Sequence, residues 1–299
     1  MATLSTSHQS RREDLRRRLS SGRILVLPGA FNPLTAKLIE RHGFEAVYLS
    51  GAVIAADLGL PDIGLTTLSE VVNRAGQVVR ATELPVVVDA DTGFGEPVNV
   101  ARTVRLLEDA GVAGLHIEDQ VNPKRCGHLD GKEVVTREAA IRRIRAAVSA
   151  RRDPNLLIIA RTDARAVHGL ADAIERAKEF VEAGADVIFP EALLDESEFR
   201  EFRRAIDAPI LANATEFGKG HLWDVQGLAN IGIDMVIFPV SLFRLAMGST
   251  ERGLLALREH GGFASMLEHM QTRAELYDVL EYASYGEFDS SVFGFELPG

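Results

Sequence analysis

The chain has 299 residues, of which 46% are hydrophobic and 25% are charged, and its formal net charge is −10 at pH 7. This composition is typical of a soluble globular protein, and the acidic balance argues against nucleic acid as a partner. No apolar run approaches the ~20 residues that span a bilayer, so we expect no membrane partner. A single cysteine excludes a disulfide within the chain and favours a reducing compartment.

The first 22 residues are rich in serine and arginine and lack the apolar core of a secretory signal. Glu13 and Asp14 also argue against a mitochondrial presequence. We therefore expect a short helix over about residues 10–19, with Leu15 and Leu19 facing the body of the protein, and a cytoplasmic location.

Short apolar runs rich in Val, Ile and Leu recur along the chain and are apolar on both faces, as buried parallel strands are. Helical periodicity follows between them, and several helical segments end at a glycine. The predicted strands are 24–27, 46–49, 85–88, 114–117, 156–160, 186–189, 209–212 and 235–238. The predicted helices include 68–81, 98–110, 137–150, 170–183 and 196–206.

Alternating strands and helices without a flexible linker predict one α/β domain over residues 1–299, with a C-terminal helical extension over about 241–285. Eight repeats favour a closed (β/α)8 TIM-type barrel over an open, doubly wound sheet. No Gly-x-Gly-x-x-Gly motif follows the first strand, which argues against a dinucleotide-binding fold.

Polar side chains follow six of the predicted strands. Any one of them is explained by a strand end that meets water, but six in series, with arginine and carboxylates mixed, indicate a site. The carboxyl ends of barrel strands converge on one face, where barrel active sites are found. The residues are Ser50, Asp89, Asp91, Glu118, Asp119, Arg161, Asp163, Glu191, Asn213, Thr215 and Glu216.

Asp89 and Asp91 stand two residues apart at a strand end, so we expect both side chains to project to the same side. Hard oxygen donors without a nearby His or Cys suit Mg²⁺ or Mn²⁺ better than zinc. Glu118, one strand further on, supports a metal site, and Asp62 could accept a hydrogen bond from metal-bound water. A pair of solvated aspartates is the simpler alternative.

The single cysteine, Cys126, lies between Lys124 and Arg125 on one side and His128 on the other. Neighbouring cations favour thiolate over thiol, so this pattern predicts a reactive cysteine. A small buried hydrophobe is the alternative. Gly127, together with Gly131, predicts an exposed, mobile loop around the thiol.

Arg161 could bind a substrate carboxylate in bidentate fashion or form a salt bridge with Asp163 or a neighbouring helix, and charge alone does not distinguish binding from a salt bridge. Asn213 and Thr215 add neutral donors. The three histidines His42, His116 and His168 show no local pattern and are interpreted as structural. The whole set is suited to making or breaking a C–C bond beside a carboxylate through an enolate.

The segment Lys124-Arg125-Cys126-Gly127-His128 resembles the signature loop of the isocitrate lyase family. The resemblance extends over about residues 15–285, and the compact chain is similar to the branch that cleaves 2-methylisocitrate. Further matching segments are Tyr48-Leu49-Ser50-Gly51, Leu60-Pro61-Asp62, Asp89-Ala90-Asp91-Thr92-Gly93-Phe94-Gly95, Ala212-Asn213-Ala214-Thr215-Glu216-Phe217-Gly218 and Met270-Gln271-Thr272-Arg273-Ala274-Glu275-Leu276-Tyr277.

The resemblance implies a barrel whose final helix is exchanged between the subunits of a homotetramer. It implies a retro-Claisen cleavage of the small tricarboxylate (2S,3R)-2-methylisocitrate into pyruvate and succinate, in propionate catabolism through the methylcitrate cycle. The metal would be Mg²⁺, with Mn²⁺ as the alternative, at Asp89 and Asp91, and Asp62 and Glu118 would reach it directly or through water.

The resemblance also implies roles for individual residues. Cys126 would be the general acid, assisted by Lys124 and His128 in its loop, and Tyr48 would handle the hydroxyl proton. Residues implied to contact substrate are Ser50, Gly51, Ala52, Gly127, Arg161, Glu191, Asn213, Ala214, Thr215, Arg244 and Arg273. From the residues alone, a solvated surface arginine is the default expectation for Arg244 and Arg273, which lie on predicted helices.

Phe189, Ile237 and Pro239 stand where relatives that cleave 2-methylisocitrate have an apolar pocket for the extra methyl group. Ala52, Ala214 and the segment 219–221 depart from the commoner family pattern, which leaves related substrates open. A 2,3-dimethylmalate lyase, an oxaloacetate decarboxylase and a phosphoenolpyruvate mutase are the alternatives, although the last two generally lack the Cys-Gly-His loop. A non-catalytic, metabolite-binding barrel is the alternative from another class.

Overall fold

The structure is a computed structural model that describes residues 7–127, 131–218 and 220–294. These residues divide into two compact units, one over Ser7–Phe243 and one that begins at Arg244. The first unit contains all of the strands and is described first.

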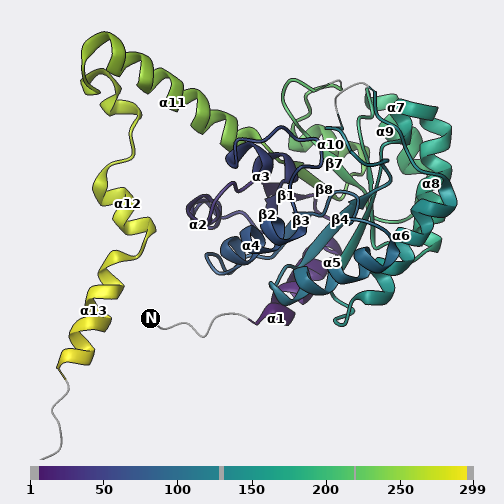
Figure 1. The fold of residues 1–299 in the computed structure, drawn as a ribbon, viewed down its shortest axis with the longest axis horizontal. Coiled ribbons are helices and arrows are strands. Elements are labelled where there is room, and N and C mark those ends of the chain that lie inside the picture. Colours follow the sequence, from purple (N-terminus) through teal and green to yellow (C-terminus); the bar gives the residue numbers. More distant parts are fainter. Residues whose placement is uncertain (1–6, 128–130, 219, 295–299) are drawn as a thin grey trace, which may run out of the picture. The chain divides into compact units, whose positions relative to one another are not determined.

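Parallel strands form the wall of a barrel in the first unit (Figure 1). They pair in the orders β1-β8-β7 and β2-β3-β4-β5-β6, and parallel bridges between Gly29 and Tyr48 and between Ile188 and Ile210 join the two sheets into a ring. The strands are β1 (Leu25–Pro28), β2 (Val47–Leu49), β3 (Val86–Asp89), β4 (Gly114–Glu118), β5 (Leu157–Thr162), β6 (Val187–Pro190), β7 (Leu211–Asn213) and β8 (Met235–Phe238). Each of the eight apolar runs forms its predicted strand, so the predicted barrel is confirmed.

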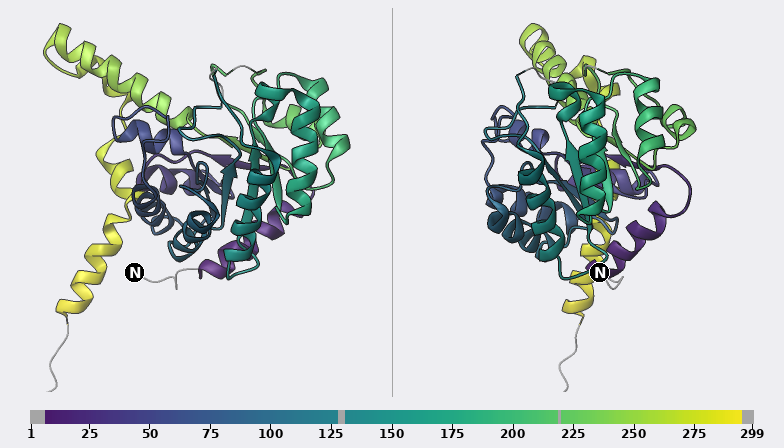
Figure 2. Two further views of the ribbon diagram at one scale, coloured as in Figure 1. Left: turned by 45° about the vertical axis from the view of Figure 1, so that its right-hand side comes forward. Right: turned by 90° about the vertical axis from the view of Figure 1, so that its right-hand side faces the viewer.

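Helices surround the strands, as both views in Figure 2 show. The helices of this unit are α1 (His8–Leu19), α2 (Pro33–Arg41), α3 (Gly51–Asp57), α4 (Leu68–Val79), α5 (Pro97–Asp109), α6 (Arg137–Ala150), α7 (Ala164–His168), α8 (Leu170–Glu182), α9 (Glu196–Ala205) and α10 (Val225–Ile231). Local sequence explains several boundaries: α4 starts with a capping box between Thr67 and Glu70, and left-handed glycines follow α5 and α8 at Gly111 and Gly184. The short helices α3 and α7, directly after β2 and β5, were not predicted.

Two apolar cores hold the barrel together. The larger lies between the strands and the surrounding helices, and the smaller fills the barrel interior with side chains such as Leu27, Val87 and Ile159. Leu15 of α1 belongs to the interior core and is fully buried. Helix α1 therefore closes the amino end of the barrel, opposite the carboxyl ends of the strands.

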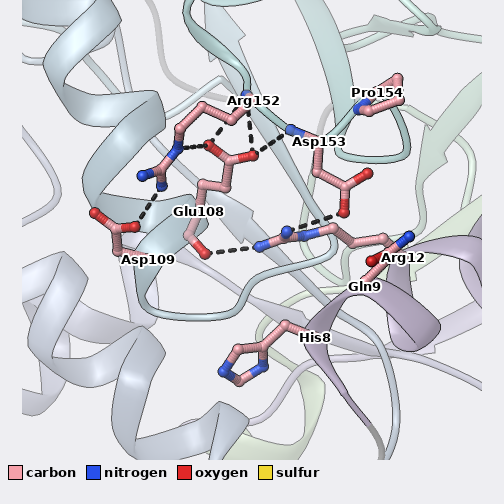
Figure 3. Close-up of a pocket in the computed structure, with 8 residues that line it drawn as sticks. All are labelled: His8, Gln9, Arg12, Glu108, Asp109, Arg152, Asp153 and Pro154. Carbon is pink, nitrogen blue, oxygen red and sulfur yellow. Dashed lines mark hydrogen bonds and ion pairs between the residues drawn. The ribbon is translucent and has the colours of Figure 1, made fainter.

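Arginines of α1 fix this closure through hydrogen bonds to the loops at the amino end. The guanidinium of Arg12 donates to the Val112 carbonyl at 2.9 Å and to the Glu108 carbonyl at 2.6 Å, and pairs with Asp153 at 3.1 Å. The Glu108 carboxylate in turn accepts from the Arg152 side chain and from the backbone N–H groups of residues 152 and 153 (Figure 3). The shallow pocket that these side chains line is thus held by polar groups that satisfy one another.

The second unit consists of helices. Helix α11 (Ser241–His260) begins in the first unit and continues into the second, where a 3₁₀ turn (Ala264–His269), α12 (Arg273–Val279) and α13 (Tyr282–Phe293) follow. Within this unit many large apolar side chains are exposed, including Tyr282, Tyr285 and Phe293. No helix in the described part of the chain is long and apolar enough to cross a membrane.

Candidate active site

Strand register brings the predicted polar residues together at the carboxyl end of the barrel. Asp89 of β3 pairs with His116 of β4, and Glu118 of β4 pairs with Arg161 of β5. Most of the predicted site residues of this unit are buried: Tyr48, Ser50, Gly51, Asp89, Asp91, Glu118, Lys124, Gly127, Arg161, Glu191 and Ala214. The half-buried ones are Ala52, Asp62, Cys126, Asn213 and Thr215.

Asp89 and Asp91 converge, as predicted, although Asp91 lies beyond the strand. Its backbone is left-handed, with φ 46°, and its N–H donates to Asp89 Oδ1 at 3.0 Å. A Cβ on Gly51 would lie 2.9 Å from Asp89 Oδ2 and 3.2 Å from Asp91 Oδ1, so both carboxylates reach the same glycine at the start of α3. The Gly51 N–H donates to Asp89 at 3.1 Å.

The Cys126 loop is less exposed than predicted. Lys124 is buried, and its ammonium contacts Asp62 and also Asp91 at 2.7 Å. Gly127 is buried and Cys126 is half-buried. The prediction of an exposed loop is therefore wrong for Lys124 and Gly127, whereas Arg125 and Gly131 are exposed as predicted. Lys124 is buried because its ammonium has carboxylate partners, and the Gly127 carbonyl accepts from Lys132. His128 lies outside the described residues.

Arg161 adopts the salt-bridged alternative of the two that its sequence context left open. Its Nε donates to Asp163 at 2.9 Å, and its guanidinium also faces Glu118 at 3.3 Å and Glu191 at 3.4 Å. The guanidinium carbon lies 5.2 Å from the centre of the Phe189 ring, which fixes it further. A cation held so rigidly is preorganised for a carboxylate ligand, so the salt bridge and the binding role are compatible.

The carboxylates of this cluster fit a divalent cation by their chemistry. Burial raises the pKa of Glu118 well above its ordinary range, and burial together with the charge of Asp89 raises the pKa of Asp91 to about 6 against the effect of Lys124. Glu118 Oε1 is buried without a hydrogen-bond partner among the described residues. A hard cation would relieve the crowding of these charges, and oxygen donors suit Mg²⁺.

The same carboxylates do not form a tight coordination cluster. Within the described ranges no three His, Cys, Asp or Glu side chains group closely enough to hold a metal ion. The ammonium of Lys124 lies against Asp91 and Asp62 and supplies positive charge to the cluster. The metal ligands that the sequence suggests therefore remain a prediction.

His116, interpreted from the sequence as structural, belongs to the site. Its Nε2 lies 2.7 Å from the Tyr48 hydroxyl and 3.5 Å from Asp89 Oδ1, and its ring packs edge-on against Phe189. Burial lowers the pKa of His116 to about 4, so the ring is neutral at neutral pH, and burial raises the pKa of Tyr48 well above its ordinary range. The sequence did contain a signal for this role of His116. It stands two residues before Glu118 in β4, and side chains two residues apart on a strand point to the same face.

The remaining predicted residues divide between the two units. Asn213 donates to Glu191 at 3.4 Å, and Asn213 and Thr215 together line a small cavity beside β6. Arg244 and Arg273 belong to the C-terminal unit, and their predicted contact with substrate stays a prediction. Phe189 and Ile237, predicted to border a methyl group, both lie in the interior core of the barrel.

This arrangement defines an α/β-barrel enzyme site for carboxylate chemistry, with cations, carboxylates and a thiol loop at one end of the barrel. The sequence profile of the phosphoenolpyruvate phosphomutase family matches residues 15–258. The chain belongs to this family, in which the 2-methylisocitrate lyases are its similar curated relatives.

Among those relatives, a probable 2-methylisocitrate lyase 1 of Corynebacterium glutamicum is 60% identical over 95% of this chain and 93% of its own length. The 2-methylisocitrate lyase of Aeropyrum pernix is 51% identical over 93% of this chain and 90% of its own length. The 2-methylisocitrate lyase of Escherichia coli K12 is 46% identical over 90% of this chain and 92% of its own length.

Solved structures share the fold over nearly the whole chain. Oxaloacetate acetylhydrolase bound to 3,3-difluorooxalacetate has a TM-score of 0.91 at 33% identity, covering 97% of this chain and 99% of the other. A 2,3-dimethylmalate lyase has a TM-score of 0.88 at 32% identity, covering 96% and 98%. A phosphonopyruvate hydrolase bound to oxalate and Mg²⁺ has a TM-score of 0.85 at 27% identity, covering 94% and 98%.

Proposed function

We propose that this protein is a carbon–carbon lyase that cleaves 2-methylisocitrate into pyruvate and succinate, as a step of propionate catabolism. The observation that carries the proposal is the meeting of the Cys126 loop with the buried Arg161 and carboxylate cluster at one end of the barrel. The names of relatives at 46–60% identity agree with this substrate.

A divalent cation, Mg²⁺ or Mn²⁺, is part of the proposal. Asp89 and Asp91 would hold it, with Asp62 and Glu118 directly or through water. When bound, it would polarise the hydroxyl and carboxylate oxygens of the substrate and neutralise the charge that develops on them. The similar structure of a phosphonopyruvate hydrolase is a complex with oxalate and Mg²⁺, which supports a divalent cation as part of the proposal.

The first proton transfer takes the proton of the substrate hydroxyl, so that its oxygen can form the carbonyl of pyruvate as the C–C bond breaks. We assign this step to Tyr48. Its hydroxyl lies 2.7 Å from Nε2 of His116, which holds the side chain in place. As tyrosinate, Tyr48 would accept the substrate proton and become the neutral phenol, the form that its burial and raised pKa favour.

The second proton transfer completes succinate. The electron pair of the broken bond moves onto the carbon next to a carboxylate, giving the aci-carboxylate of succinate, and this carbon must receive a proton. Cys126 is the proposed donor, with Lys124 and His128 as the cationic neighbours that stabilise its thiolate afterwards. The thiol acts as an acid and forms no covalent adduct with substrate.

Substrate carboxylates would be bound by Arg161, Asn213 and Thr215 from the strand ends, and the family resemblance adds Arg244 and Arg273. Backbone groups after β2 and the Cys126 loop would complete the binding site, at Ser50, Gly51, Ala52, Gly127, Glu191 and Ala214. The methyl group would contact Phe189, Ile237 and Pro239, a difference worth only about 1–3 kcal/mol of discrimination.

We further propose a homotetramer in which the final helix is exchanged between subunits, located in the cytoplasm and without nucleic-acid or membrane partners. Exposed apolar side chains along α13, such as Tyr285 and Phe293, support burial of this helix in an assembly. The single cysteine is compatible with a reducing compartment. Light scattering should report the mass of four 32.6 kDa chains.

The experiment for the proposed function measures pyruvate release from 2-methylisocitrate by the purified protein, with and without EDTA. We expect release that EDTA abolishes and that added Mg²⁺ restores. No release under any metal condition would favour a non-catalytic barrel, and release that is unaffected by EDTA would contradict the role of the cation.

A further inference from the structure

Lys132 is a buried lysine at the far end of the Cys126 loop. Its side chain is only 2% exposed, and its ammonium donates to the backbone carbonyl of Gly127 and to Asp163 Oδ1, the latter at 2.7 Å. Gly127 directly follows Cys126, and Asp163 follows β5. Lys132 therefore connects the residue beside the thiol to the barrel wall.

Asp163 is also the principal partner of Arg161. Arg161 donates to both oxygens of Asp163, at 2.9 and 3.2 Å, so one fully buried carboxylate is shared by Arg161 and Lys132. Gly127 lies directly against the same arginine, because a Cβ on Gly127 would meet Arg161 Nη2 at 2.5 Å and Glu191 Cγ at 2.5 Å. Asp163 therefore binds both Arg161 and Lys132, the lysine that contacts the loop at Gly127.

Burial of a lysine ammonium is costly, and a loop lysine ordinarily extends its charged end into water. Here the ammonium is turned inward and donates to the carbonyl of Gly127, the residue that lies against Arg161. The part of the loop that precedes Cys126 is held by other hydrogen bonds. The Gln120 side chain donates to the Arg125 carbonyl and accepts from the Arg125 N–H, at 2.9 Å each. Lys132 contacts the part of the loop next to the thiol, at the Gly127 carbonyl.

We propose that Lys132 is a positioning residue that ties the Gly127 carbonyl to Asp163 and so holds the Cys126–Gly127 segment against Arg161. Its role in turnover rests on the proposed function, whereas its hold on the loop does not. Lys132 would act through Cys126 and would not itself touch the substrate.

The hold on the loop is tested by the rate at which iodoacetamide alkylates Cys126, measured by mass spectrometry without substrate. Since the chain has one cysteine, the whole signal reports this thiol. We expect Lys132→Met to be alkylated about tenfold faster than wild type, because the charge-assisted bonds to Gly127 and Asp163 are lost. Loss of a nearby positive charge alone would lower the thiolate fraction and slow the reaction, so an increase reports exposure.

Matched variants separate the hold on the loop from other effects. Lys178→Met makes the same substitution at an exposed lysine on α8 and should leave the rate unchanged. Lys132→Gln keeps a neutral donor for the Gly127 carbonyl and should give an intermediate rate. Circular dichroism and thermal unfolding confirm that each variant is folded, and if Lys132→Met is not, Lys132→Gln decides.

The consequence for turnover is tested by steady-state kinetics with 2-methylisocitrate. A misplaced thiol should lower kcat of Lys132→Met by about 100-fold. KM should change less than about threefold, since Arg161 keeps Asp163, Glu118 and Glu191. A folded variant with both the wild-type alkylation rate and the wild-type kcat would overturn the proposal. If the wild-type protein turns over no acid, the proposed function fails while the alkylation rates still test the hold of Lys132.

Discussion

The two ends of the barrel are both rich in charge, and they use it in opposite ways. At the amino end, the arginines of α1 are paired with backbone carbonyls and carboxylates, as Arg12 is with Val112, Glu108 and Asp153. At the carboxyl end, acidic side chains crowd together beyond the supply of donors, and Glu118 keeps a buried oxygen without a hydrogen-bond partner among the described residues.

This difference indicates that the amino end stabilises the fold, whereas the carboxyl end costs stability for the sake of a ligand. Buried charges without full compensation are unfavourable, and natural proteins keep them where a function depends on them. Substitutions at the carboxyl end should therefore lower activity more than stability, and substitutions at the amino end should lower stability more than activity.

Replacement of the proposed acid should give the largest loss of activity. We expect Cys126→Ser to lower turnover of 2-methylisocitrate by about 10²–10⁴-fold, the usual contribution of a general acid, while substrate binding is largely kept. Pyruvate release measures the first and isothermal titration calorimetry the second. Glu133→Gln, an exposed change in the same loop, serves as the control. Wild-type turnover in the serine variant would remove Cys126 from the mechanism.

Glu118→Gln should separate activity from stability at the carboxyl end. We expect turnover to fall by about 100-fold, because a carboxylate of the proposed metal site is lost. The free energy of unfolding of the metal-free protein should stay within about 1 kcal/mol of wild type, since the raised pKa of Glu118 favours its neutral form and glutamine keeps the shape of that side chain. Urea denaturation measures the change, and a loss of more than about 1 kcal/mol would argue against a strained cluster.

At the amino end, Arg12→Met should have the reverse effect. The carbonyls of Val112 and Glu108 would each lose the hydrogen bond from Arg12, and Asp153 would lose this cationic partner. We therefore expect a loss of about 2–5 kcal/mol in the free energy of unfolding. Because α1 lies at the far end of the barrel, kcat/KM at 25 °C should stay within about twofold of wild type. A variant of wild-type stability would show that α1 does not hold the barrel closed.

The smallest effect is expected at Arg17, on the same helix. Its side chain is 73% exposed and pairs with Asp14 one turn away. We expect Arg17→Ala to change the free energy of unfolding by no more than about 0.5 kcal/mol. A loss as large as that of Arg12→Met would mean that the charge of α1, and not its buried contacts, stabilises the amino end.

The barrel was predictable from the sequence because burial on both faces gives each strand a short run of apolar residues, such as 114–117 in β4. Helices with strong caps were also found, as α6 was over residues 137–150. The short helices α3 and α7 were missed because each is less than two turns long and directly follows a strand, leaving no periodicity to read.

The site was predictable where chemistry follows a strand end, as at Asp89, Glu118 and Arg161. It was not predictable where the role of a residue depends on what lies across the barrel. His116 is an ordinary strand residue until the ring of strands places it against Tyr48. Lys132 looks like a surface lysine in a glycine-bounded loop, and only the fold turns its ammonium toward Asp163.

The proposed reaction is the cleavage of 2-methylisocitrate at the carboxyl end of this barrel. The most direct measurement compares kcat/KM for 2-methylisocitrate, isocitrate and 2,3-dimethylmalate side by side, at a fixed Mg²⁺ concentration. We expect 2-methylisocitrate to be cleaved with the highest kcat/KM, about 10-fold or more above isocitrate, as a methyl pocket allows. A higher kcat/KM for 2,3-dimethylmalate, or no cleavage of any of the three acids, would contradict this account.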